Sequence, residues 1–193
     1  YRLMIANQIA GLLTGGVAAS LTDYESIQTV SVTSGGGSAS LSFTSIPSTY
    51  SHLQIRGIAR NTSAGTASDY ILLKMNSDTG SNYAFHWLYG TGSAAGATAS
   101  INRTNLPIGT CWEVSALANS FSTVVCDILD YANVSKFKTT RSLGGGDTNG
   151  GSFQEVNMMS GLWRDTAAIN RIDISSSAGN LAQYSSFALY GIK

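Results

Sequence analysis

The sequence predicts an all-β fold, a jelly-roll-like antiparallel β-sandwich with a short N-terminal arm. Short segments of alternating apolar and polar residues recur along the chain, separated by turns rich in Gly, Ser and Asn, as expected for half-buried strands. After the first twenty residues, no segment keeps a helical period long enough for a βαβ unit. A length of 193 residues suits one domain. We therefore divide the chain into an attachment arm, residues 1–22, and a β-sandwich domain, residues 23–193.

The N-terminal arm contains a segment with a helical pattern, residues 2–13. This segment is too short to span a bilayer, which needs about 20 apolar residues. A secretory signal peptide is one alternative, since Arg2 precedes the apolar run and small residues follow at 17–19. We expect instead that the arm binds a neighbouring subunit or another protein of the same assembly through its apolar residues Leu3, Ile5, Ile9, Leu12 and Leu13.

Beyond the arm, alternating segments and turn signals predict roughly nine or ten strands, which is typical of a two-sheet sandwich or jelly roll. Residues 90–98 are nearly all Gly, Ser, Ala and Thr, and we expect a loop there. A second, glycine-rich loop is expected at 144–151. The strand-like segments on which this rough count rests are 26–33, 39–44, 52–60, 69–76, 83–89, 111–114, 121–131, 136–143, 153–163, 169–175 and 186–192.

Residues 42–60 have the pattern of a strand, a proline corner and a second strand. Pro47 has no N–H to donate and should end the first strand, so that the chain turns between sheets. Alternate side chains of the second strand face opposite sides, which places Leu53 and Ile55 in the core. The outward side chains, which we expect to face a neighbouring subunit or a glycan, are His52, Gln54 and Arg56.

The most aromatic segment, residues 83–89, also alternates, so its four aromatic side chains share one face. That face either packs in the sandwich core or forms a platform for sugar rings or a subunit contact, because Tyr and Trp combine a large apolar area with a polar group. Trp87 is our candidate for the second role. The four aromatic residues are Tyr83, Phe85, Trp87 and Tyr89.

Charged side chains are scarce in this chain. Lys and Arg number 11 and Asp and Glu number 11, so the net charge is zero and charged residues make up 11% of the sequence. A typical soluble domain has about 25%. A neutral chain lacks the basic patch that nucleic acid or an anionic membrane requires, and we expect neither as a partner. A low charge density also favours close packing against neighbours in an assembly.

The motifs that could carry chemistry are better explained as structural features, so we expect no enzymatic activity, no cofactor and no bound metal. The triplet 78–80, Asp-Thr-Gly, matches the aspartic-protease motif but follows a polar segment, and we interpret it as a turn. His52 and His86 have no G-x-S-x-G nucleophile turn to serve. The glycine-rich residues 144–151 are not followed by the lysine of a phosphate-binding loop.

Two cysteines, Cys111 and Cys126, occur without a C-x-x-C motif or paired histidines, so they do not form a zinc set. We interpret them as two small buried thiols. A disulfide is the alternative, and it would require their Cβ atoms to face one another across adjacent strands.

Several phrases of the domain are similar to a known group of proteins. They lie at 23–27 (Asp-Tyr-Glu-Ser-Ile), 45–56, 78–83, 160–163 (Ser-Gly-Leu-Trp) and 187–192 (Phe-Ala-Leu-Tyr-Gly-Ile). In these phrases the chain resembles virion structural proteins of tailed bacteriophages, often of cyanophages. The resemblance covers about residues 23–192. It implies a β-rich module displayed on the virion, assembled in the cytoplasm of the bacterial host, with no catalytic residues to transfer.

Within that group we expect a capsid decoration or cement protein that stabilises or decorates the head, because no heptad or collagen repeat indicates a long fibre. Its expected partners are further copies of the chain, in a trimer, and the major capsid protein. The alternative is a tail or fibre-tip adhesin that contacts tail proteins and binds a host surface glycan through Trp87 or Trp112. A glycan hydrolase would need a carboxylate pair, and none is identifiable.

Overall fold

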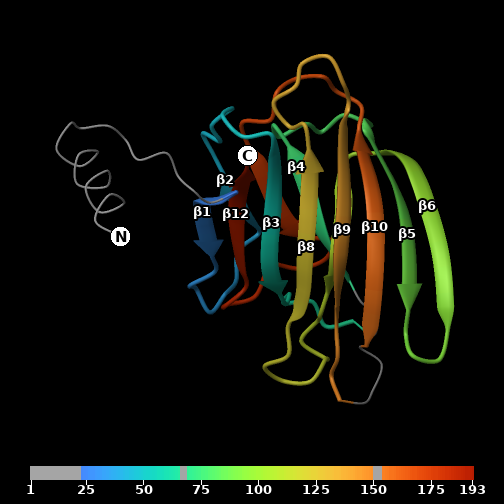
Figure 1. Cartoon of the computed structure of the whole chain (residues 1–193). Helices are drawn as coiled ribbons and strands as arrows, with labels where there is room; N and C mark the ends of the chain where they lie inside the picture. Colours follow the sequence, from blue (N-terminus) through green and yellow to red (C-terminus); the bar gives the residue numbers. More distant parts are fainter. Residues whose placement is uncertain (1–22, 66–68, 150–153) are drawn as a thin grey trace, which may run out of the picture.

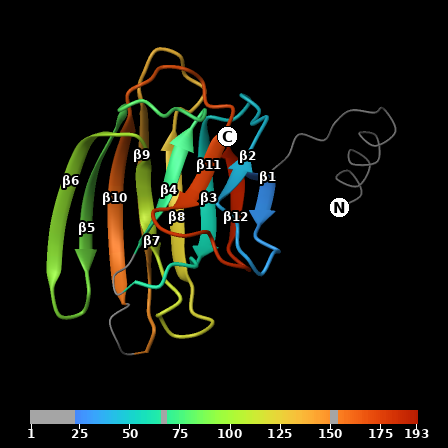
Figure 2. The same ribbon diagram turned by 180° about the vertical axis from the view of Figure 1, so that it is seen from behind.

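The computed structural model describes residues 23–65, 69–149 and 154–193, and within these ranges the fold is an antiparallel β-sandwich of two sheets with no helix. Figures 1 and 2 show the larger sheet as one layer and the smaller sheet as a second layer behind it. The all-β sandwich prediction is confirmed. The expected arm, with Leu3, Ile5, Ile9, Leu12 and Leu13, lies outside the described residues.

Within the described ranges, eight strands form the larger sheet and four form the smaller one. The larger sheet consists, in spatial order, of β1 (Tyr24–Ser31), β12 (Ser186–Ile192), β3 (His52–Ala59), β8 (Ser122–Leu129), β9 (Lys138–Gly146), β10 (Glu155–Trp163), β5 (Tyr83–Gly90) and β6 (Ala95–Arg103). The smaller sheet consists of β2 (Ser40–Phe43), β11 (Ile172–Ser176), β4 (Asp69–Met75) and β7 (Leu106–Cys111). Because β12 pairs with both β1 and β3, the two ends of the domain meet in one sheet.

Twelve strands are described, more than the nine or ten expected, and the differences lie in the middle of the chain. The loop expected at 90–98 is largely strand, because β6 begins at Ala95 and pairs with β5. The strand expected at 111–114 is wrong, since Cys111 is the last residue of β7. β7 contains Pro107, which it tolerates because it is an edge strand that pairs only with β4.

The hydrophobic core lies between the two sheets. In β8 every second side chain from Ser122 to Ile128 is buried, and those between them are half-buried or exposed. Leu53 and Ile55 are fully buried, as predicted. Burial of an aliphatic or aromatic side chain contributes about 1.5–3 kcal/mol. The aromatic members of this core are Phe43, Tyr83, Tyr131, Trp163 and Phe187.

Pro47 marks the crossing between the sheets, as predicted, because β2 lies in the smaller sheet and β3 in the larger one. The crossing is held by hydrogen bonds to its backbone. The amide of Ile46 donates to the carbonyl of Asn170 at 3.0 Å, and the hydroxyl of the buried Tyr131 donates to the carbonyl of Pro47. The proline therefore ends the β2 ladder, and residues just before β11 and just after β8 supply the hydrogen-bond partners of the crossing.

Arg60 holds the connection between β7 and β8. Its guanidinium donates to four backbone carbonyls at 2.8–3.0 Å, those of Val114, Ala116, Leu117 and Ser120. The side chain is buried in doing so. The bond to the Ala116 carbonyl is buried and the other three are partly buried, and a carbonyl left buried without a partner costs about 1–3 kcal/mol. One guanidinium thus supplies hydrogen bonds to loop carbonyls that have no strand partner.

We predict that Arg60→Ala lowers the free energy of unfolding by about 2–4 kcal/mol, because it leaves several loop carbonyls unpaired. Urea unfolding followed by tryptophan fluorescence measures this loss. The matched control is Arg141→Ala, since the Arg141 side chain is 70% exposed and pairs with Asp127 at 3.0 Å. An exposed ion pair contributes less than about 1 kcal/mol. Equal losses in the two variants would contradict the role of Arg60.

Candidate functional site

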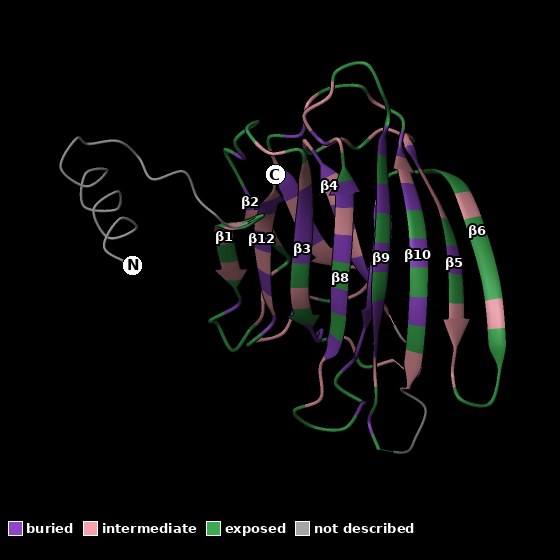
Figure 3. Ribbon diagram, viewed as in Figure 1, coloured by how far each residue is buried: buried purple, intermediate pink, exposed green. Residues whose placement is uncertain are grey.

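The outer face of the larger sheet, turned away from the smaller sheet, carries exposed apolar side chains. Figure 3 shows exposed stripes that alternate with buried ones across β8, β9 and β10. The exposed fractions run from 40% for Val125 to 61% for Val156. In cross-strand register Val125 lies opposite Leu143, Leu143 opposite Met158, and Met158 opposite Leu88. We define the apolar band as Leu88, Val125, Leu143, Val156 and Met158.

The apolar band arises because several strands are apolar on both faces. Antiparallel sheets with one solvated face usually alternate apolar and polar residues. In β8 and β10, by contrast, the pairs Val124-Val125 and Met158-Met159 place one apolar side chain inside and the next one outside. These adjacent apolar pairs are the sequence signal that could have found the band. Their alignment into one row depends on strand register, which the sequence does not display.

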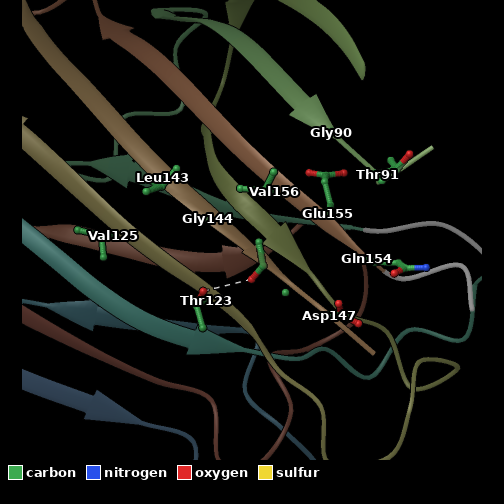
Figure 4. A pocket seen from close by; sticks show the side chains of 13 residues that line it. Gly90, Thr91, Thr123, Val125, Leu143, Gly144, Asp147, Gln154, Glu155 and Val156 are labelled. Atoms are coloured by element: carbon green, nitrogen blue, oxygen red, sulfur yellow. Dashed lines mark hydrogen bonds between the residues drawn. The ribbon is translucent and has the colours of Figure 1, made fainter. Parts of the chain in front are cut away.

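An open depression of about 610 Å³ adjoins the apolar band. It lies between the turn after β5, the end of β9 and the start of β10. Figure 4 shows its lining side chains. Its lining contains three members of the apolar band and two acidic residues. The lining side chains that decide this character are Val125, Leu143, Val156, Asp147 and Glu155.

The floor of the depression is backbone. β9 continues through Gly146, into the segment where a loop was expected. Gly145 has a φ of 144°, and a Cβ at this position would lie 2.1 Å from the carbonyl oxygen of Glu155. The hydroxyl of Thr123 donates to the carbonyl of Gly145 at 3.2 Å (Figure 4). Desolvation raises the pKa of Glu155, although the amide of Asn157 donates to its carboxylate.

Polar side chains border the apolar band on β3 and β8, and they include two of the expected outward residues. Gln54 faces outward but is only 8% exposed, so the expectation that it is free to contact a partner is corrected. Its amide donates to Asp127 at 2.7 Å, and Arg56 Nε donates to its carbonyl oxygen at 2.7 Å. The Arg56 guanidinium lies 5.4 Å from the ring centroid of Tyr24 and 5.0 Å from that of Tyr190. Arg56 therefore covers Gln54 and remains at the surface itself.

His52, the third expected outward residue, lies at the start of β3 with its side chain 37% exposed. Its Nδ1 accepts a hydrogen bond from the backbone amide of Asp130 at 3.0 Å. The Asp130 carboxylate pairs with Lys136, and its Oδ1 lies 3.7 Å from His52 Nδ1. His52 thus helps to order the turn after β8 and remains available at the margin of the outer face.

Trp87 lies on the inner side of β5, and it is only 8% exposed. Its ring packs edge-on against Tyr70 with centroids 5.2 Å apart, and it contacts Tyr89 at 5.0 Å. Its indole N–H has no hydrogen-bond partner among the described residues. Trp112 is fully buried. Neither tryptophan presents a face on which a sugar ring could stack, so the core alternative describes Trp87 better than the platform alternative.

Asp78 forms a turn, as predicted. Its carboxylate accepts hydrogen bonds from the Gly80 amide at 2.7 Å, from Asn82 Nδ2 at 2.9 Å and from the indole of Trp163 at 2.6 Å. Desolvation by burial acts to raise the pKa of Asp78, but these three hydrogen bonds outweigh it and hold the pKa below its usual value. The aspartate therefore fastens the turn after β4 to β10.

Cys111 and Cys126 are buried free thiols, as predicted, and the disulfide alternative is wrong. Desolvation by burial raises the pKa of Cys111 to about 12 and also raises the pKa of Cys126. A thiol reacts as its thiolate, so neither cysteine is activated. Among residues 23–65, 69–149 and 154–193, no cluster of three or more His, Cys, Asp or Glu side chains could hold a metal ion. No helix in these ranges is long and apolar enough to cross a membrane.

We predict that Asp78→Asn lowers the free energy of unfolding at pH 7 by about 1–3 kcal/mol, because it weakens hydrogen bonds to a charged acceptor. The native pKa of Asp78 lies below the unfolded value of about 3.9. The carboxylate therefore contributes fully above that value, and its contribution is lost as the pH falls through the native pKa. Urea unfolding of both proteins from pH 7 to pH 2 should show the difference shrinking at the acidic end. A difference independent of pH would contradict this assignment.

Comparisons with known proteins do not show to which family this chain belongs. No protein-family model matches the chain, and no curated protein matches it. The resemblance to bacteriophage virion proteins therefore rests on the short phrases quoted above. The outer face, where the apolar band lies beside the depression and the polar border of Gln54, Arg56 and Asp127, is the candidate functional site.

Proposed function

We propose that this chain is a non-enzymatic structural protein of a bacteriophage virion, and that it decorates or cements the head shell. The observation that carries the proposal is the apolar band on the outer face. Its five members are each at least 40% exposed and lie on four adjacent strands. Contiguous exposed apolar patches on a folded domain commonly mark sites of protein contact.

The surroundings of the apolar band resemble the anatomy of a protein interface. Interface centres are depleted in charge and enriched in residues such as Met, and their rims are polar. The apolar band contains Met158 and no charged residue, and Gln54, Asp127 and Arg141 lie in the next cross-strand row. These features support contact with copies of the chain, in the expected trimer, and with the major capsid protein. We assign attachment to the arm, residues 1–22.

A tail or fibre-tip adhesin is the second candidate, and the depression of about 610 Å³ is the observation that favours it. Asp147, which is exposed, carries a carboxylate that sugar hydroxyls could donate to, whereas the Glu155 carboxylate accepts a hydrogen bond from Asn157. The burial of Trp87 and Trp112 removes the stacking residues expected for this role. The adhesin is therefore less well supported than the shell protein.

The location of the chain is tested by its copy number in purified particles, measured by quantitative mass spectrometry against the major capsid protein. A shell protein should be present in hundreds of copies, because the shell repeats one lattice contact. A few dozen copies or fewer would overturn the shell assignment and indicate the tail. Binding of the purified chain to a glycan array would then test the adhesin, with Asp147→Asn as the variant expected to weaken it.

We predict that the double variant Leu143→Glu, Met158→Lys loses at least about tenfold in occupancy on particles that lack the wild-type copy, because buried interface centres dominate binding. The two positions lie opposite one another, so the new charges pair and should preserve the fold. The control adds the same charges at exposed polar positions, Thr139→Glu and Thr29→Lys. Retained occupancy of the first variant would exclude the apolar band as the contact.

A further inference from the structure

The edges of the two sheets differ in how well they are protected from pairing with another strand. An edge strand has N–H and C=O groups without a ladder partner, and proteins usually block it with bulges, prolines, charges or short length. The edges here are β1 and β6 in the larger sheet, and β2 and β7 in the smaller one. β1 has a register shift between Ser26 and Gln28, β2 has four residues, and β7 contains Pro107 and is buried throughout.

β6 carries none of these features over most of its length. Its pairing with β5 is regular from Ala95 to Ser100, and the register shift lies beyond that stretch. Every residue of β6 is half-buried or exposed, and neither proline nor a charged residue occurs before Arg103. Figures 1 and 2 show β6 at the side of the molecule, next to β5 and away from the smaller sheet.

We infer that β6 pairs antiparallel with β6 of a second copy of this chain. A two-fold axis perpendicular to the sheet relates the copies, because such an axis keeps the outer faces on the same side. Directly opposed residues of an antiparallel pair share a face, so one residue of β6 must lie directly opposite the same residue of the second copy, with the axis midway between the two. The axis at Ala97 uses the regular stretch and opposes Ala95 to Ala99 of the second copy.

The composition of β6 favours a second copy of the chain as the partner that pairs with this open edge. A symmetric contact places each residue against its symmetry mate or a near neighbour, so a charged strand would repel itself. The stretch Ala95–Ser100 is uncharged, and its side chains are small. Ala97 also lies opposite Leu88 in the sheet. In each copy, a cross-strand row runs from Val125 through Leu88 to Ala97. Pairing Ala97 with its symmetry mate therefore joins the two rows into one.

This contact is independent of the proposed virion role, since it concerns only the purified chain. It also differs in kind from a trimer contact. A ring of three copies uses a heterologous contact, whereas the β6 pair is isologous and joins two copies. The two can coexist, and the β6 pair would then link one trimer to the next.

The test compares Ala97→Lys and Ala97→Glu, each alone and mixed, by sedimentation equilibrium. Each variant alone opposes like charges on the axis, and we expect its dimer dissociation constant to rise at least about tenfold. The equimolar mixture opposes Lys to Glu, so association should return to within about threefold of the wild type. Recovery in the mixture also shows that both variants are folded.

The matched control is Thr139→Lys, which adds the same charge at an exposed position of β9 and should leave association unchanged. A wild-type chain that sediments only as a monomer would overturn the inference. So would association that Ala97→Lys leaves unchanged, or a mixture that stays dissociated.

A second readout places the axis. The native cysteines Cys111 and Cys126 are buried, so a new thiol at the edge should react alone. We expect Ala97→Cys to give a covalent dimer on a non-reducing gel after treatment with a mild thiol oxidant. Opposed Cβ atoms in an antiparallel pair lie about 4.5–5.5 Å apart, close to disulfide geometry. Thr139→Cys is the control. Failure of Ala97→Cys to crosslink would exclude the axis at Ala97.

Discussion

The packing of a four-stranded sheet on an eight-stranded sheet is the constraint on which the rest of this structure depends. Burial between the sheets requires alternate side chains of every covered strand to be apolar, which accounts for the core positions Leu53, Ile55 and Val124. The smaller sheet can cover one face of the larger sheet and leaves the other face to solvent. The unequal width also leaves β5 and β6 at the margin. The open edge at β6 follows from this mismatch in width, whereas the exposed outer face follows from the two-layer architecture itself.

Cations inside the domain replace the backbone partners that loops lack. Arg60 donates to the carbonyls of the connection between β7 and β8. Lys138 is fully buried at the start of β9, and its Nζ donates to the carbonyls of Asn133 at 2.6 Å and Thr166 at 3.0 Å. Desolvation by burial lowers the pKa of Lys138, but its ammonium remains satisfied by these acceptors. In a chain with only 11 Lys and Arg residues, part of the small charge complement has a structural role.

The sequence predicts the fold well where side chains alternate and less well where they are small. Period two in β3 and β8 and the corner at Pro47 indicate the two sheets. β6 was missed because Ala, Gly, Thr and Ser do not alternate in polarity, so only pairing with β5 defines it. Gln54 was expected to be exposed, but Arg56 covers it, a contact that local pattern does not display. The apolar band was missed because its row joins residues from β5, β8, β9 and β10, whose register is a tertiary property.

The glycines beside the apolar band make the depression a feature of the main chain. In one cross-strand row Thr123 lies opposite Gly145, Gly145 opposite Val156, and Val156 opposite Gly90. Two of these four positions have no side chain, and Gly145 has no room for one. A hollow lined by side chains changes shape when rotamers change, but a hollow between backbone ladders keeps its shape. Its outline should therefore be preserved while the neighbouring side chains, and with them any ligand preference, are free to diverge.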